Sequence, residues 1–242
     1  MIPHTQATNM IHGGSMQKPR GRQNLKVNHT TGVKIMYTNI RGLKGKRSSL
    51  IEQLDAEQPH LFLLTETLLP TDLEAQIEGY TFFSRARTGK QGGGVAILAR
   101  EDICKNLIPH ISDRDIEMIW VSYKIKKCSP LYIGCYYGKQ ESRCTKDEIA
   151  TEMENLLEEI QENLNEGEVL VFMDGNGKIG LLGEDKSRNG KLIEQVVTSN
   201  EMVFINKNEK CIGKITRTNS NNTNEKSAID FVQPSYVLIR RK

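Results

Sequence analysis

The chain has 242 residues, a formal net charge of +3, 37% hydrophobic residues and 26% charged residues. These fractions are typical of a globular protein with a buried core and argue against bulk disorder. The length is compatible with a single α/β domain. The sequence contains no apolar run near the roughly 20 residues needed to cross a bilayer, and no secretory signal. We therefore expect an intracellular protein with no membrane partner.

The cysteines indicate a reducing compartment. Their number is five, so one would stay unpaired, and none forms a C-x-x-C pair. Both facts argue against a disulfide framework and against a structural zinc site.

Positive charge is concentrated at the start of the chain. No Asp or Glu precedes Glu52, whereas nine lysines and arginines lie between Lys18 and Arg47. Residues 1–31 show no apolar periodicity, which predicts a disordered basic leader followed by a folded domain over residues 32–242. The leader is either a solvated flexible arm or a segment that binds nucleic-acid phosphates.

The folded part begins with a pattern of strand, helix and strand. Apolar and polar residues alternate over residues 33–39, which predicts a strand. Residues 50–54 place their leucines on one helical face, and this helix is expected to end before Pro59. The continuous apolar run 61–64 predicts a buried strand that carries Glu66 at its C-terminal end.

The middle of the chain is predicted to be mostly sheet. Three consecutive glycines, residues 92–94, precede the apolar run 95–98 and suggest a tight turn or bulge. Strands are expected at residues 95–98, 119–125 and 131–137.

The clearest predicted helix follows Thr145. Thr145 and Glu148 have the spacing of a capping box, and an apolar stripe continues to Gly167. The acidic residues between the apolar positions are expected on the solvated face of this helix: Glu152, Glu154, Glu158, Glu159 and Glu162.

A second buried strand, residues 169–173, ends at Asp174. It is followed by a loop with the turn signal Asn189-Gly190 and by a short helix near residues 192–197. The last predicted strands are residues 203–205, 212–216 and 228–232.

Glu66 and Asp174 are the two candidates for chemistry. Each ends a buried strand, and the C-terminal ends of strands are where α/β proteins gather catalytic groups. Magnesium takes oxygen ligands, usually one or two carboxylates with waters and phosphate, so few carboxylates suit phosphodiester chemistry. Taken singly, each residue is better explained as a strand-end carboxylate that caps a turn than as a catalytic group.

A series of short motifs carries a more specific signal. In chain order they are Asn39-Ile40-Arg41-Gly42-Leu43, Thr65-Glu66-Thr67, Gly92-Gly93-Gly94-Val95, Tyr136, Asp174-Gly175-Asn176, Asn189-Gly190 and Ser227-Ala228-Ile229-Asp230. This series resembles that of the endonuclease domains of non-LTR retrotransposons, which belong to the exonuclease-endonuclease-phosphatase superfamily. The resemblance covers residues 33–232. It implies a DNase I-like α/β fold of two packed mixed β-sheets flanked by helices, a four-layer sandwich.

The resemblance also implies an activity. The chain is expected to be a hydrolase that nicks DNA with Mg²⁺ or Mn²⁺ and leaves a 3'-hydroxyl that primes reverse transcription. Its partners would be DNA and the reverse transcriptase domain of the same element, and it would act as a monomer in the nucleus.

The central site residues follow from matching motifs. By resemblance, Asn39 lies beside the scissile phosphate and Glu66 binds the metal ion. Asp174 activates the attacking water, and Asn176 helps to position it.

The remaining matches concern the phosphate and the DNA. By resemblance, Tyr136 hydrogen-bonds the phosphate and Asp230 orients a downstream histidine. Arg41 and Thr216 are the candidate DNA-binding residues. Arg41 stands where related repair AP endonucleases have an acidic metal-site residue.

The sequence departs from the family at its end. The family closes with Ser-Asp-His after the position of Asp230, whereas here all five histidines precede the second half of the chain. This predicts a C-terminally truncated domain with impaired nicking.

Three alternatives remain. Residues 175–180 fit G-x-G-x-x-G, but the segment that follows is predicted as loop instead of the helix that dinucleotide binding requires. A second alternative is a superfamily phosphodiesterase or phosphatase that acts on a small phosphorylated substrate. The third is a catalytically inactive retroelement remnant that at most binds DNA.

Overall fold

The computed structural model describes the side chains and backbone of residues 33–70, 76–87, 92–124, 127–180 and 184–206, and the backbone alone of residues 207, 217–219, 222–227 and 237–240. The chain divides into two units, residues 1–32 and residues 33–242, and every described residue belongs to the second.

The first sheet has four strands in the order β1-β2-β4-β3. Their bounds are β1 Ile35–Asn39, β2 Leu61–Thr65, β3 Tyr80–Arg85 and β4 Val95–Arg100. β1 and β2 are parallel, while β4 is antiparallel to both of its neighbours. The sheet is therefore mixed, and its parallel pair ends at one edge.

The second sheet has six strands in the order β5-β6-β7-β8-β12-β9. Their bounds are β5 Leu107–Ile111, β6 Glu117–Tyr123, β7 Leu131–Tyr137, β8 Glu168–Asp174, β9 Met202–Phe204 and β12 Val237–Arg240. β7 and β8 are parallel and the other pairings are antiparallel. A separate hairpin consists of β10 Arg217–Asn219 and β11 Asn222–Ser227.

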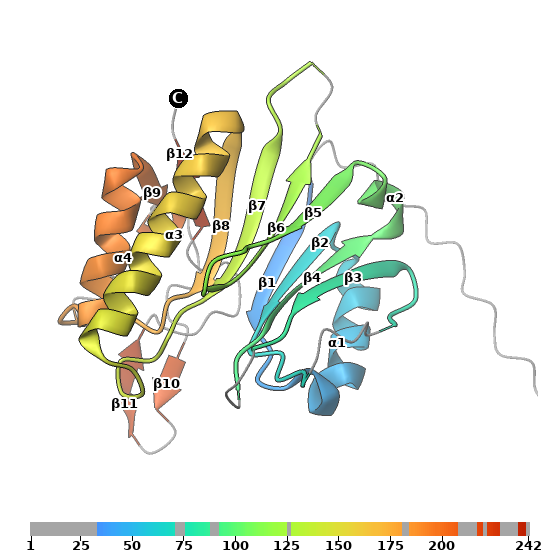
Figure 1. The fold of residues 1–242 in the computed structure, drawn as a ribbon. Coiled ribbons are helices and arrows are strands. Elements are labelled where there is room, and N and C mark those ends of the chain that lie inside the picture. Colours follow the sequence, from blue (N-terminus) through green and yellow to red (C-terminus); the bar gives the residue numbers. More distant parts are fainter. Residues whose placement is uncertain are drawn as a thin grey trace, which may run out of the picture. The chain divides into compact units, whose positions relative to one another are not determined.

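The helices cover the outer faces of the two sheets (Figure 1). α1, Leu43–Glu57, packs on the first sheet, and α3, Lys146–Glu166, and α4, Arg188–Ser199, lie side by side over the second. Two short elements complete the fold, α2 Glu101–Cys104 and the 3-10 helix Ile205–Lys207. The predicted fold, two packed mixed sheets between helices, is confirmed.

The core follows from the alternation of side chains along each strand. Leu63 and Ile97 of the first sheet face the second sheet, whereas Leu64 and Leu98 face α1. All four are fully buried. Strands with both faces covered must be apolar at every position, which explains the continuous runs in β2 and β4.

α3 begins as the sequence predicts. Thr145 accepts a hydrogen bond from the Glu148 amide, and the Glu148 carboxylate accepts one from the Thr145 amide. Burial of Ile149, Met153 and Leu156 continues along one face of the helix. These apolar contacts hold α3 against the second sheet.

Two of the acidic residues of α3 contradict the prediction of a solvated face. Glu152 is 1% exposed and Glu159 is 6% exposed. Glu159 accepts hydrogen bonds from Trp120 Nε1 at 2.8 Å and from the Ser112 hydroxyl. These buried donors lie on other elements, so the helical pattern alone could not reveal them.

The prediction of a turn at Asn189-Gly190 is wrong. Both residues lie in the first turn of α4, which begins at Arg188. Ser187 is the N-cap residue and accepts a hydrogen bond from the Gly190 amide at 3.2 Å. Gly190 is required by packing, because a Cβ there would lie 1.7 Å from the Lys178 carbonyl oxygen. No helix begins within residues 175–180, which removes the context for dinucleotide binding.

Other predictions have mixed outcomes. The strands expected at residues 212–216 and 228–232 fall outside the described residues. The strands β3, β5, β10, β11 and β12 lie outside the predicted strands. Within the part of the chain that the structure describes, no helix is long and apolar enough to cross a membrane.

Candidate active site

The site forms where parallel strands of both sheets end. In the first sheet, Asn39 of β1 is paired with Thr65 of β2, which Glu66 follows. In the second sheet, Tyr137 of β7 is paired with Asp174 of β8. The two edges meet directly, because Asn39 Nδ2 donates a hydrogen bond to Asp174 Oδ2 at 2.8 Å.

Asp174 is held from both sides. Its side chain is fully buried, and its Oδ1 accepts a hydrogen bond from the Asn176 amide at 3.0 Å. Asn39 in turn accepts a hydrogen bond from the Arg41 amide through Oδ1 at 3.2 Å. The orientation of the carboxylate is therefore set by two amide donors, one from each sheet edge.

Glu66 is positioned by a tyrosine from the opposite sheet. The Tyr137 hydroxyl donates to Glu66 Oε1 at 2.9 Å, and Gln140 Nε2 donates to the same hydroxyl at 3.3 Å. Burial raises the pKa of Tyr137 above its ordinary value. The hydroxyl therefore keeps its proton and remains a donor to Glu66.

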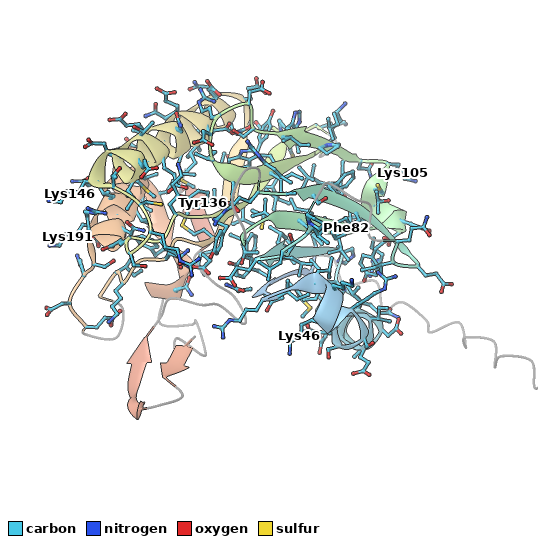
Figure 2. All side chains as sticks on the ribbon, turned by 60° about the horizontal axis from the view of Figure 1, so that its bottom comes forward. Lys46, Phe82, Lys105, Tyr136, Lys146 and Lys191 are labelled. Atoms are coloured by element: carbon cyan, nitrogen blue, oxygen red, sulfur yellow. The ribbon has the colours of Figure 1, made fainter. Side chains whose placement is uncertain are left out.

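The tyrosine in this cluster is Tyr137, and the structure does not place Tyr136 there. Adjacent residues of a strand point to opposite faces of the sheet. Tyr137 shares the inner face with Asp174, whereas Tyr136 lies on the opposite face, near Glu152 of α3. Tyr136 is labelled in Figure 2. Burial, and then the Glu152 carboxylate, raise the pKa of Tyr136 well above its ordinary value. A sequence signal for Tyr137 exists: like Asp174, it is the last residue of its strand.

Backbone strain marks the same edge. Arg41, Glu66 and Asn176 have φ angles of 50°, 52° and 47°. Residues with side chains seldom adopt this left-handed region, and such strain is concentrated at functional sites. Each of these residues immediately follows the end of a parallel strand or lies two positions beyond it.

Further contacts join the glycine loop to the site. The Gly94 amide donates to Glu117 Oε2 at 2.6 Å, and Glu117 pairs with Arg87. The Arg87 guanidinium lies 5.3 Å above the Tyr137 ring, a cation–π contact. Burial raises the pKa of Glu117, against the opposing effects of the Gly94 amide and Arg87.

A cleft of about 340 Å³ adjoins the cluster. It is lined by residues of β3, β6, α3 and the loop after β7, among them Arg87, Glu117, Lys139, Arg143 and Glu152. The Arg143 side chain makes no hydrogen bond or ion pair to the residues that the structure describes. The cleft therefore offers a cationic side chain, and its lining includes Gln140, which contacts Tyr137.

Two predicted site residues, Thr216 and Asp230, lie outside the described residues. Arg41 is exposed at the site edge, next to Asn39. Asn189, part of a predicted motif, is fully buried, and its Nδ2 donates to the Lys139 carbonyl oxygen at 2.8 Å. The structure thus brings together Asn39, Glu66, Asp174 and Asn176, and adds Tyr137 and Gln140.

Several solved structures share this architecture. The 3'-phosphatase NExo from Neisseria, bound to a product DNA hairpin, has 14% identity and a TM-score of 0.65, covering 86% of this chain and 87% of its own. The AP endonuclease LMAP from Leishmania major has 15% identity and a TM-score of 0.65, with 86% and 79% covered. The endonuclease domain of TRAS1, a telomere-specific non-LTR retrotransposon, has 14% identity and a TM-score of 0.58, with 86% and 84% covered.

The chain has the DNase I-like fold of the AP endonucleases. Neither a protein-family model nor a curated protein matches the sequence. The similarity of this DNase I-like chain to these structures is therefore a similarity of fold, and its chemistry depends on the residues of its own site.

Proposed function

We propose that the chain is a divalent-metal-dependent DNA endonuclease domain of a non-LTR retrotransposon, which acts in the nucleus together with the reverse transcriptase of the same element. The observation that carries this proposal is the hydrogen bond between Asn39 and Asp174 across the two sheet edges. Together with the pairing of Asn39 and Thr65, which Glu66 follows, this contact supports a single site for the proposed base, its amide partners and Glu66.

The residues present fit a magnesium ion. No three His, Cys, Asp or Glu side chains of the described ranges group closely enough to form a protein cage for a metal. Mg²⁺ does not need one, because it usually binds one or two carboxylates together with waters and phosphate oxygens. Glu66 is partly exposed, and within the described part of the chain no residue hydrogen-bonds its Oε2. Glu66 would hold the ion, which stabilises charge on the phosphate when bound.

The protein groups account for the remaining steps. Asp174 accepts a proton from the water as the water oxygen bonds to phosphorus, while Asn39 and Asn176 keep the carboxylate aligned. The bond from phosphorus to O3' breaks, and O3' takes up a proton from solvent. The products are a 3'-hydroxyl and a 5'-phosphate.

Tyr137 is assigned a positioning role toward Glu66, which differs from the hydrogen bond to the phosphate that the resemblance implies for Tyr136. Its hydroxyl orients Glu66 and is itself oriented by Gln140. Such supporting contacts matter because small misplacements of catalytic groups reduce rates strongly.

DNA is the substrate favoured by the surroundings. Structures with the same fold include AP endonucleases, a phosphatase bound to DNA and a retrotransposon endonuclease domain. The nine basic residues from Lys18 to Arg47 and the cleft residue Arg143 supply positive charge that suits a phosphate backbone.

The test is magnesium-dependent nicking of supercoiled plasmid. Asp174→Ala and Glu66→Ala should each lower the rate by about a hundredfold or more, because each removes a group that acts in the reaction. Glu154→Ala, which removes an exposed carboxylate of α3, is the matched control and should retain activity. Phosphate release from inositol phosphates without nicking would instead support a small-molecule phosphatase. DNA binding with no turnover would support an inactive remnant.

A further inference from the structure

The first residue of the loop after Tyr137 is hydrogen-bonded to two residues of the proposed site, Asp174 and Asn176. The Gly138 amide donates to the Asp174 carbonyl oxygen at 2.8 Å. The Gly138 carbonyl oxygen accepts from Asn176 Nδ2 at 2.7 Å. The start of the loop is therefore part of the same rigid unit as the proposed base.

The next residue, Lys139, is bound from the two outer helices. Its carbonyl oxygen accepts from Asn189 of α4 at 2.8 Å. Its amide donates to both carboxylate oxygens of Glu152 of α3, at 3.0 Å and 3.3 Å. Glu152 thus fixes the position of the Lys139 amide. Lys139 directly precedes Gln140, which contacts the Tyr137 hydroxyl.

Glu152 is an unusual residue for this position. It is 1% exposed, whereas Glu154, Glu158 and Glu162 of the same helix are exposed to solvent. The charged and titratable groups that face it are Tyr136 from β7, Glu117 from β6 and Lys139 from the loop. Arg85, Arg87, Asp115, Arg143 and Glu148 line the same cleft. A buried carboxylate is unfavourable unless it is hydrogen-bonded or paired, and the Lys139 amide supplies hydrogen bonds to Glu152.

We propose that Glu152 is a positioning residue that holds the loop 138–140, and with it the Gln140–Tyr137–Glu66 chain, and that its ionisation makes catalysis dependent on pH. This inference rests on the proposed nuclease function of the site. The loop is the link, since Gln140 Nε2 donates to the Tyr137 hydroxyl, which donates to Glu66.

The direction of the pH dependence follows from the environment of the carboxylate. Burial raises the pKa of Glu152 to about 7, against the opposing effects of the Lys139 amide and side chain. Above this pH the carboxylate offers both oxygens as charged acceptors to the Lys139 amide, and charged hydrogen bonds are the stronger ones. As the pH falls through about 7, protonation removes that charge and loosens the loop.

The first experiment compares pH profiles of nicking. In the wild-type protein kcat should rise between about pH 6 and pH 8, whereas in Glu152→Gln this rise should be absent and kcat at the upper end about tenfold lower, with KM little changed. Glu159→Gln is the matched control, because it also neutralises a buried carboxylate of α3, one that contacts Trp120 instead of the loop. Its pH profile should follow that of the wild type. A Glu152→Gln profile parallel to that of the wild type would overturn the inference.

The second experiment does not depend on activity. The NMR resonance of the Lys139 amide should titrate with a midpoint near 7 in the wild-type protein. The same resonance should not titrate in Glu152→Gln. If the wild-type protein does not nick DNA at any pH but this amide titrates, the proposed function fails and the loop contact stands. An amide that does not titrate refutes the pH dependence assigned to Glu152, whether or not the protein nicks DNA.

Discussion

At the scale of single residues, the site depends on which face of a strand each side chain occupies. Tyr136 and Tyr137 are adjacent and both fully or almost fully buried. The Tyr136 hydroxyl lies near the Glu152 carboxylate of α3, whereas the Tyr137 hydroxyl donates a hydrogen bond to Glu66. Their expected effects on catalysis therefore differ, although their chemistry is identical.

Tyr137→Phe is expected to lower kcat by about tenfold, because a hydrogen bond to a charged group contributes roughly 1.5–3 kcal/mol. It should also raise the magnesium concentration required for half-maximal activity, since Glu66 loses the donor that orients it. Steady-state nicking over a magnesium series measures both effects. Tyr136→Phe should have a smaller effect and leave the magnesium requirement unchanged. Equal magnesium requirements in wild type and Tyr137→Phe would refute the assignment.

At the scale of elements, the loop that carries Glu66 is fixed by the glycine loop before β4. The Thr67 amide donates to the Gly94 carbonyl oxygen at 3.1 Å, and the Leu68 amide donates to that of Gly93 at 2.9 Å. Gly94 has a φ of 88°, and a Cβ there would lie 2.5 Å from the Thr67 hydroxyl oxygen. Glycine is therefore required both by the backbone conformation and by the close approach.

Gly94→Ala should reduce the free energy of unfolding by about 1–3 kcal/mol, the usual range for strain of this kind. It should also reduce nicking, because the Glu66 loop must move. Gly45→Ala is the control, since this glycine lies in α1 with no atom within 4 Å of an added Cβ. That change should stabilise the protein by roughly 0.5–1 kcal/mol. Urea denaturation measures both variants, and a Gly94→Ala protein as stable as the wild type would show that the loop tolerates a side chain.

At the scale of the whole molecule, the site exists because two mixed sheets end together. Asn39 and Asp174 are 135 positions apart in sequence and 2.8 Å apart between their side-chain atoms. The basic residues at the start of the chain are expected to strengthen DNA binding through their positive charge. Charge of that kind acts over distance and is screened by salt.

Removal of residues 1–31 should leave the urea midpoint nearly unchanged and weaken DNA binding mainly at low salt. The reason is that Lys18, Arg20, Arg22 and Lys26 are lost, and phosphate contacts of lysine and arginine set the salt dependence of affinity. Equilibrium binding over a salt series tests this. A loss of affinity that is the same at all salt concentrations would rule out the electrostatic role, and a loss of folding would rule out the domain boundary.

The sequence by itself determined the elements that depend on local pattern. The capping box of α3, the buried runs of β2 and β8 and the bounds of β7 all follow from periodicity and capping, which act between near neighbours. The strand-end positions of Glu66 and Asp174 could be located in the same way. Strands such as β3 and β5, whose residues differ in exposure, have no comparable apolar run in the sequence.

Only the tertiary structure decided the contacts that join separate elements. The register of β7 against β8 places Tyr137, and not Tyr136, beside Asp174. The packing of α3 on the second sheet buries Glu152 against the Lys139 amide, although helical periodicity assigns it to the solvated face. The physical reason is that a buried polar side chain is determined by its partner, and the partner lies on another element.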